Sequence, residues 1–180
     1  MKAQSISLAE AFRFSLRGTA SSVTIISTQL DAVRYGMVAT AVIPVSMSPP
    51  SLVVAINRTA SIHDPLEKRG AFAINFLSDI NETVVRGFSE ARGEDRFLFG
   101  RWLSRKILDE PESHSLPCLA GAQAVVLCRL SDVHRWGTHS LFIGEVSNVL
   151  RTDRLSPLLY CDGGYGSFCP PSGTPMVHRT

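Results

Sequence analysis

The stretch from Tyr35 to Asn57 limits what this chain can fold into more than any other part of the sequence. Two apolar runs rich in β-forming residues meet at Pro49-Pro50, which predicts two strands joined by a stiff turn. The first run carries small side chains, so its backbone is poorly shielded and can approach a flat molecule. The second ends at Asn57, beside a predicted helix start. Such an arrangement can hold a planar ring at one end and a phosphate at the other.

Composition places the chain among ordinary globular domains. Its 180 residues are 44% hydrophobic and 19% charged, which predicts one domain with a sizeable core. The formal net charge of +2 is too small to indicate a nucleic-acid partner or an anionic membrane surface. The residues from Met1 to Phe12 lack the apolar core of a signal peptide, and no window reaches the length of a membrane span. We therefore expect a cytoplasmic protein.

Cysteine and histidine spacing argues against a disulfide framework and against a preformed metal site. The four cysteines form no CxxC pair, and buried or idle thiols are the expected state. The five histidines show neither an H-E-x-x-H motif nor an i, i+4 pair. The chain also lacks a G-x-S-x-G elbow, a Walker A loop and a G-x-G-x-x-G fingerprint.

Local patterns predict many strands and a few short helices. A helix should begin at a capping box formed by Ser7 and Glu10, and a β-branched strand follows it. The apolar run that starts at Tyr35 reads as one strand, with Pro44 at a bulge or on an edge. Ser61 should be the N-cap of the next helix. Further predicted elements are strands at 71–77, 123–133, 141–150 and 157–161, a helix at 81–88, and a loop over 135–139 that is longer than a two-residue turn.

These elements indicate a β-barrel with helical decoration rather than alternating βαβ units. We expect a single domain over residues 1–169 and a loose tail over residues 170–180. The segment 90–106 interleaves arginines with aromatic residues. It could bind a phosphate or a nucleic acid, although a solvated helix with its aromatic side chains facing the core is the simpler interpretation.

Several spaced motifs together resemble the flavin reductase family, from about Phe12 to Phe168. The motifs follow one another in the order that the family shows, and within the family they are most similar to the reductase component of two-component aromatic monooxygenases, of the 4-hydroxyphenylacetate 3-monooxygenase type. The matching segments are Gly36–Pro50, Ala55–Asn57, Phe72–Leu77, Arg96–Trp102, Gly137–Val146 and Pro157–Tyr160.

The resemblance implies an FMN-binding split β-barrel that forms a homodimer. It also implies an enzyme that binds FMN or FAD, reduces it with NADH or NADPH, and releases reduced flavin to a separate monooxygenase. His139 matches the histidine on the nicotinamide side, and Tyr165 would lie at the pocket mouth. The remaining residues that the resemblance assigns to cofactor binding are Val38, Ala39, Thr40 and Ala41 for the ring, Ala55, Ile56 and Asn57 for the ribityl chain, Ser61 and Ile62 for the phosphate, Arg96 for a phosphate or adenylate, and Ser46.

The chain departs from the family where hydroxyl side chains are usual, notably at Val38 and Ala41. A ring held there would depend more on backbone groups, so a flavin-binding module without turnover is the alternative to the reductase. A reductase for another acceptor, such as a ferric chelate or a nitro compound, is a third hypothesis. Hydride transfer between two stacked rings needs no general base, which suits a site of small residues, amides and hydroxyls.

Overall fold

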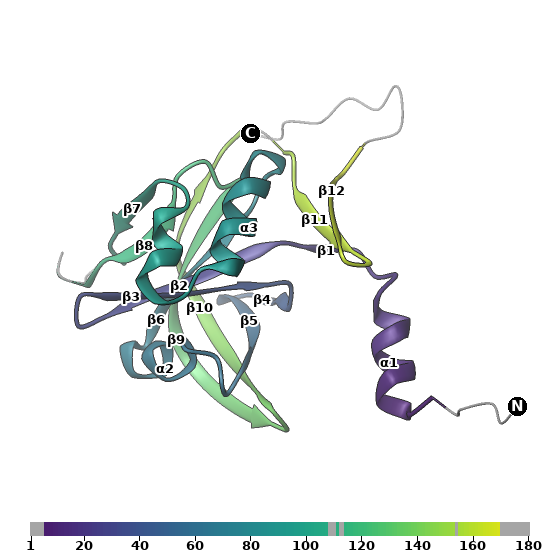
Figure 1. The fold of residues 1–180 in the computed structure, drawn as a ribbon. Coiled ribbons are helices and arrows are strands. Elements are labelled where there is room, and N and C mark those ends of the chain that lie inside the picture. Colours follow the sequence, from purple (N-terminus) through teal and green to yellow (C-terminus); the bar gives the residue numbers. More distant parts are fainter. Residues whose placement is uncertain (1–5, 108–110, 112–113, 154, 170–180) are drawn as a thin grey trace, which may run out of the picture.

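A curled antiparallel sheet of seven strands forms the body of the protein in a computed structural model (Figure 1). The structure describes residues 6–107, 111, 114–153 and 155–169, so the predicted tail lies outside the described residues. The helical elements are α1 Leu8–Leu16, α2 His63–Arg69, η1 Asp79–Asn81, α3 Glu82–Glu90 and η2 Gly93–Leu98. The strands are β1 Ser21–Ser22, β2 Thr24–Leu30, β3 Val33–Ala39, β4 Val42–Met47, β5 Pro50–Asn57, β6 Ala71–Phe76, β7 Trp102–Arg105, β8 Leu116–Leu119, β9 Ala124–Trp136, β10 His139–Arg151, β11 Leu158–Cys161 and β12 Gly164–Ser167.

The large sheet has the strand order β3-β2-β6-β9-β10-β5-β4, so β3 and β4 are its two edges. These edges follow one another in the chain and are joined only by Thr40 and Ala41. Three Cα–Cα steps of 3.8 Å separate the ends of the strands by about 11 Å at most. The sheet must therefore curl until its edges approach each other, which produces a barrel that is split between β3 and β4.

The prediction of a single strand from Tyr35 onward is thus wrong, because this segment forms two strands, β3 and β4, on opposite edges of the sheet. β3 pairs with β2, whereas β4 pairs with β5 and carries a register shift between Pro44 and Ser46. Proline cannot donate to a ladder, so an edge strand with a bulge accommodates it, as the sequence indicated. The Pro49-Pro50 break does join two strands, with a cis peptide bond between Ser48 and Pro49.

Two hydrophobic cores lie on the two faces of this sheet. One fills the barrel and includes Ile56, Phe72 and Phe142, with Ile62 and Leu66 from the start of α2. The other lies between the sheet and a cover of α3, η2 and β8, where Phe88, Phe97 and Trp102 form an aromatic cluster. Phe97 and Trp102 of the 90–106 segment therefore face the core, whereas Phe99 is exposed. 3₁₀ turns and a strand replace the expected helix.

The motif glycines Gly36 and Gly144 are explained by close packing against this sheet. A Cβ atom on Gly36 would lie 2.6 Å from Phe88, and one on Gly144 would lie 2.5 Å from Phe72 and 2.9 Å from Cys128. Real Cβ contacts are longer than this, so only glycine lets the aromatic rings approach the strands so closely.

Two local predictions at chain reversals need correction. The loop at 135–139 is a two-residue turn, because β9 continues to Trp136 and β10 begins at His139. The helix predicted to have Ser61 as its N-cap starts at His63, one residue later than expected, and its N-cap is Ile62 without a side-chain cap. The β2–β3 turn at Asp31-Ala32 has positive φ at both residues, so it is made without the glycine that such turns favour.

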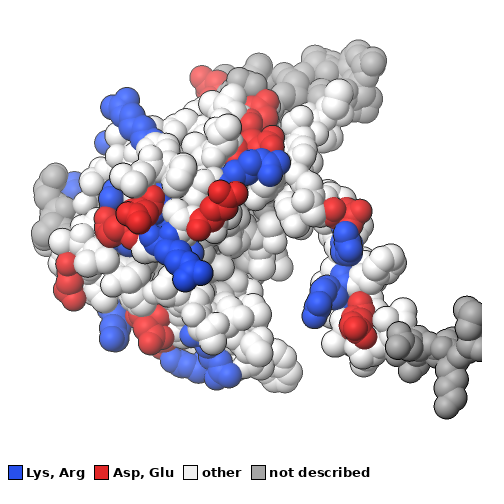
Figure 2. Space-filling view, viewed as in Figure 1, with Lys and Arg blue, Asp and Glu red and all other residues white. Residues whose placement is uncertain are grey.

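The N-terminal helix α1 stands away from the barrel, beyond the β11–β12 hairpin (Figure 1). It has the predicted capping box, in which Glu10 and Ser7 bond each other's backbone, yet none of its residues is buried. On the face shown in Figure 2, charges of both signs are interspersed over the barrel and α1. Among the described residues, no helix is long and apolar enough to cross a membrane.

Candidate active site

The split between β3 and β4 gathers the first group of predicted site residues. Val38 and Ala39 end β3, and Thr40 and Ala41 cross the split. The carbonyl oxygen of Ala41 accepts a hydrogen bond of 3.1 Å from the amide of Ala55 on β5. The two sides of the predicted ring site are therefore tied together by the backbone.

A cavity of about 210 Å³ lies on one side of this crossing. Val38, Ala39 and Thr40 line it together with Tyr160 and Tyr165, which extend from the β11–β12 hairpin. The two tyrosine rings pack edge to face with centroids 5.5 Å apart. The structure thus brings Tyr165 to the predicted ring residues, and it adds Tyr160, which the sequence offered only as part of a motif.

A larger cavity of about 540 Å³ lies next to it, lined by Thr40 and Ala41 on one side and by residues of α1 on another. Arg13 and Arg17 line it along with Tyr160. The Arg17 guanidinium donates to Asp162 at 2.6 Å. Because Asp162 also lines the cavity and offsets Arg17, Arg13 supplies its remaining positive charge. Local sequence patterns did not single out this charge, because it depends on where α1 lies in space.

The second group of site residues meets at the adjacent ends of β5 and β10. His139 pairs directly with Asn57 on β5 and with Trp136 on β9, so the three residues form a row across three strands. Residues that pair directly share one face of a sheet. His139 is exposed, and its Nδ1 lies 2.8 Å from the hydroxyl of Thr138, so Nε2 is the nitrogen that can meet a ligand.

Trp136 is a further candidate that sequence reasoning missed. Its side chain is 77% exposed, although tryptophan is normally well buried. It neighbours His139 in the row described above, on the same face of the sheet. The sequence analysis placed Trp136 in a loop over 135–139, whereas it ends β9, so its pairing with His139 was not foreseen.

The segment that follows Asn57 forms the third part of the site. The Asn57 side chain accepts hydrogen bonds of 3.0 Å from the amide and the hydroxyl of Thr59, and the amide of Arg58 donates to the Thr138 carbonyl at 3.0 Å. Ser61 is exposed in this turn. The turn is therefore attached to the β9–β10 hairpin that carries His139.

Three of the predicted residues have surroundings that limit what they can contribute. Ile56 and Ile62 are fully buried in the barrel core, so only their backbone could meet a ligand. Ser46 pairs with Ser51 at the far end of β5, about 20 Å from Asn57 at ~3.3 Å per residue, and its hydroxyl accepts from the Ser48 amide. The structure does not bring Ser46 to the other residues.

Arg96 has structural partners. Its guanidinium donates to the backbone carbonyls of Ala91 and Gly36 and lies over the Phe88 ring, which connects η2 and α3 to β3. A role in binding phosphate or adenylate would compete with these bonds.

The chemistry available here is that of binding and orientation. Among the described residues, no group of three metal-ligand side chains comes together. Burial raises the pKa of the Cys118 and Cys128 thiols to about 12, so these two buried cysteines are poor nucleophiles. The gathered groups are backbone amides at strand ends, small side chains, hydroxyls, two tyrosines and one exposed histidine.

A split antiparallel barrel with a ring-sized cavity at its opening defines the class of cofactor-binding split barrels. The flavin reductase like domain matches residues 16–168 of this chain. The chain belongs to the flavin reductase family.

Named relatives agree with this assignment. The FADH(2)-dependent resorcinol hydroxylase reductase component of Rhizobium sp. is 32% identical over 162 residues, covering 88% of this chain and 87% of the relative. FMN reductase (NADH) RutF of Pseudomonas syringae is 31% identical, with 93% and 89% covered. The 4-hydroxyphenylacetate 3-monooxygenase reductase component of Escherichia coli is 30% identical, with 83% and 85% covered.

Among solved structures, the NADH:FAD oxidoreductase SgcE6 of Streptomyces globisporus superposes with a TM-score of 0.81 at 25% identity. The match covers 94% of this chain and 100% of that one. The fold class and the family resemblance found in the sequence are confirmed.

Proposed function

We propose that this chain is an NAD(P)H:flavin oxidoreductase that reduces FMN or FAD and supplies reduced flavin to a separate monooxygenase. One observation carries the proposal: small residues at the split of the barrel, Val38, Ala39 and Thr40, line a cavity together with Tyr160 and Tyr165. The relatives named above are reductases, and two of them are components of two-component hydroxylases or monooxygenases. They give no support to a flavin-binding module without turnover.

The cavity between the β3–β4 link and the tyrosine hairpin fits a planar ring. Val38, Ala39 and Thr40 form one wall, and Tyr160 and Tyr165 form another. Small side chains on the first wall let a ring approach the backbone, whose amides and carbonyls can bond its polar edge. Ala41 and Ala55 would continue this wall toward Asn57.

The turn from Asn57 to Ser61 is the proposed phosphate site. The Ser61 hydroxyl is exposed, and the turn is held in place by the Asn57 side chain and by Thr138. A phosphate carries nearly two negative charges and is stabilised by hydroxyl and amide donors. Ser46 and Arg96 remain predictions from the resemblance, without such support.

His139 is the proposed contact for the hydride donor. When bound, the flavin and nicotinamide rings supply the hydride-transfer chemistry themselves. The protein then has to hold the nicotinamide ring against the flavin ring in one orientation. An exposed imidazole whose Nδ1 is already hydrogen-bonded is suited to this. The 540 Å³ cavity, with Arg13 and the Arg17–Asp162 pair in its lining, offers room for a second nucleotide moiety.

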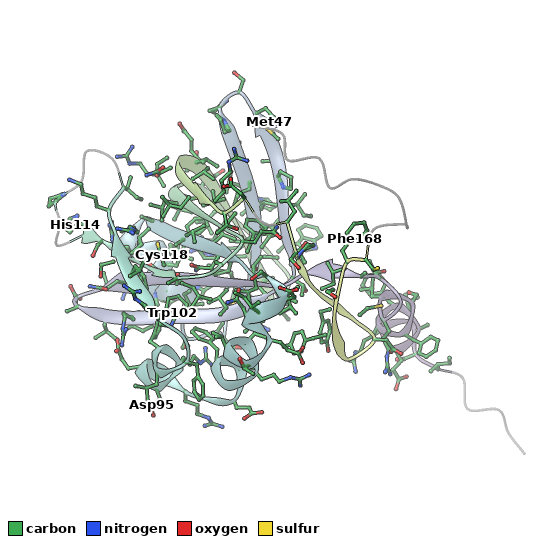
Figure 3. All side chains as sticks on the ribbon, turned by 90° about the horizontal axis from the view of Figure 1, so that it is seen from above. Met47, Asp95, Trp102, His114, Cys118 and Phe168 are labelled. Atoms are coloured by element: carbon green, nitrogen blue, oxygen red, sulfur yellow. The ribbon has the colours of Figure 1, made fainter. Side chains whose placement is uncertain are left out.

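We further propose that the protein is a homodimer in which a second copy covers the apolar surfaces of α1 and β4. Phe14 on α1 is 73% exposed and Met47 on β4 is 81% exposed. Figure 3 shows Met47 at the tip of a hairpin that extends away from the barrel. Other exposed apolar side chains on these elements are Leu8, Phe12, Leu16, Ile43 and Val45. A nine-residue helix with no buried residue is marginal alone, so a partner surface would account for it.

The test of this function is oxidation of NADH and NADPH by the purified protein, with FMN, FAD or a ferric chelate added in excess. Turnover that saturates in both nucleotide and flavin is expected, with the reduced flavin accepted by a supplied monooxygenase. Background oxidation with intact flavin binding would contradict the reductase and favour the binding module. Turnover that occurs only with the ferric chelate would contradict flavin as the substrate.

A further inference from the structure

The buried His63 is the most unusual polar group in the barrel. It is 5% exposed, and both of its ring nitrogens have partners. Nδ1 lies 2.7 Å from the carboxylate of Asp64, and Nε2 lies 2.9 Å from the hydroxyl of Ser140. The ring also packs edge-on against Phe142, with centroids 5.2 Å apart. None of the functions proposed above uses this histidine.

The proton positions follow from the partners. The hydrogen bond from His63 lowers the pKa of Asp64, so this carboxylate is ionised at neutral pH and can only accept. Nδ1 of His63 therefore carries a proton and donates it to Asp64. In the neutral ring Nε2 then accepts the proton of the Ser140 hydroxyl. The carboxylate thus fixes both the tautomer and the orientation of the ring.

The serine, histidine and carboxylate are arranged in the order of a hydrolase triad, but the serine cannot act as a nucleophile. Ser140 is 0% exposed, and its side chain points into the barrel on the face opposite to His139. No substrate carbonyl can reach its hydroxyl without opening the core. The cluster must therefore act through structure rather than through direct attack.

The location of this bond gives it a function. His63 follows Ile62 at the start of α2, directly after the turn that carries Ser61. Ser140 follows His139 at the start of β10 and pairs with Ile56, the neighbour of Asn57. One buried hydrogen bond thus connects the proposed phosphate turn with the strand that presents the histidine.

Resting on the reductase function proposed above, we propose that His63 is a positioning residue that acts through Ser140 to fix His139 for the hydride donor. The first residues of β10 follow a two-residue turn at the end of a hairpin, where ladders fray most easily. A hydrogen bond from the core to the second residue of the strand holds this end. Small displacements of a positioning group have large effects on the rate.

Three substitutions test the proposal. Gln at position 63 can reach Ser140, whereas the shorter Asn keeps only the Asp64 side, and Ser140→Ala removes the other partner. We expect His63→Asn and Ser140→Ala each to lower kcat/KM for the nicotinamide nucleotide about 10-fold, with no further loss in the double variant. His63→Gln should stay within about 3-fold of the unmodified protein, as should the control His114→Gln.

Thermal unfolding and FMN binding are measured on every variant. A loss of kcat/KM in His63→Gln as large as in His63→Asn, additive losses in the double variant, or an unchanged His63→Asn would each overturn the proposal. Ser140→Ala removes a single oxygen and keeps the test available where His63→Asn does not fold.

A second readout does not depend on activity. The imidazole signals of His139, assigned by comparison with His139→Gln, are recorded by ¹⁵N–¹H NMR without added nucleotide. They should shift in Ser140→Ala and His63→Asn but not in His114→Gln, and signals that stay in place would refute the coupling. An unmodified protein that oxidises no nucleotide with any flavin would refute the reductase, while these spectra would still decide on the positioning.

Discussion

His139 sits where three strands meet, and its exposed ring is the most direct test of the proposed site. His139→Ala should lower kcat/KM for NADH about 10- to 100-fold, because one orienting donor is lost. The dissociation constant of FMN should change less than about 2-fold, since the ring cavity is made by β3 and the tyrosine hairpin. Stopped-flow oxidation of NADH and flavin fluorescence quenching measure the two quantities.

The control for this prediction is His114→Ala, which removes a histidine beside the β2–β3 turn. A His139→Ala protein with unchanged turnover would remove this residue from the mechanism. A His139→Ala protein that loses turnover and FMN affinity together would instead place it in the flavin site.

Ser61 is tested by comparing FMN with riboflavin, which lacks the phosphate. Ser61→Ala should weaken FMN binding about 3- to 10-fold, the equivalent of one charge-assisted hydrogen bond in an exposed site. Riboflavin affinity should not change. Isothermal titration with both ligands separates the phosphate from the ring.

Ser131→Ala is the matched control for Ser61→Ala, because Ser131 is an exposed serine on β9. If FMN and riboflavin lose affinity equally in Ser61→Ala, the hydroxyl supports the fold of the turn and does not bind phosphate. If neither changes, the phosphate is bound elsewhere, and the arginines of the 540 Å³ cavity become the next candidates.

At the scale of elements, the packing of β10 on β6 and β9 requires Gly144. Gly144→Ala should lower the free energy of unfolding by about 1–3 kcal/mol, because the added methyl group would lie 2.5 Å from the Phe72 ring. Denaturant unfolding followed by circular dichroism measures this change. Gly166→Ala on β12, where a Cβ atom meets nothing within 4 Å, should change stability by less than about 0.5 kcal/mol.

A Gly144→Ala protein of unaltered stability would mean that Phe72 moves aside at little cost. The core would then be less tightly packed than the distances indicate.

At the scale of the whole molecule, the exposed apolar side chains of α1 and β4 predict a dimer. The double variant Phe12→Glu/Met47→Glu should be a monomer, whereas the unmodified protein should be a dimer. Burying each carboxylate at an apolar interface would be costly. Light scattering after size-exclusion chromatography measures the mass. Ile80→Glu, an equally drastic change at an exposed residue of η1, should leave the dimer intact.

A single-chain mass for the unmodified protein would contradict the homodimer. A dimer that survives both glutamates would place its interface elsewhere on the surface.

The sequence alone determined most of the β-rich architecture, because strand propensity, proline breaks and capping boxes act over a few neighbouring residues. The box at Ser7, the Pro49-Pro50 turn and the strand over 71–77 needed nothing more. Motif order further indicated the family, and with it the ring residues and His139.

Only the tertiary structure decided where the first apolar run breaks and which residues become neighbours. The break at Thr40-Ala41 arises from closing the sheet into a barrel, which no local pattern encodes. The pairing of His139 with Asn57 and the bond between His63 and Ser140 join residues 77 or more positions apart. Such contacts depend on strand register, and register is set by the core of the complete sheet.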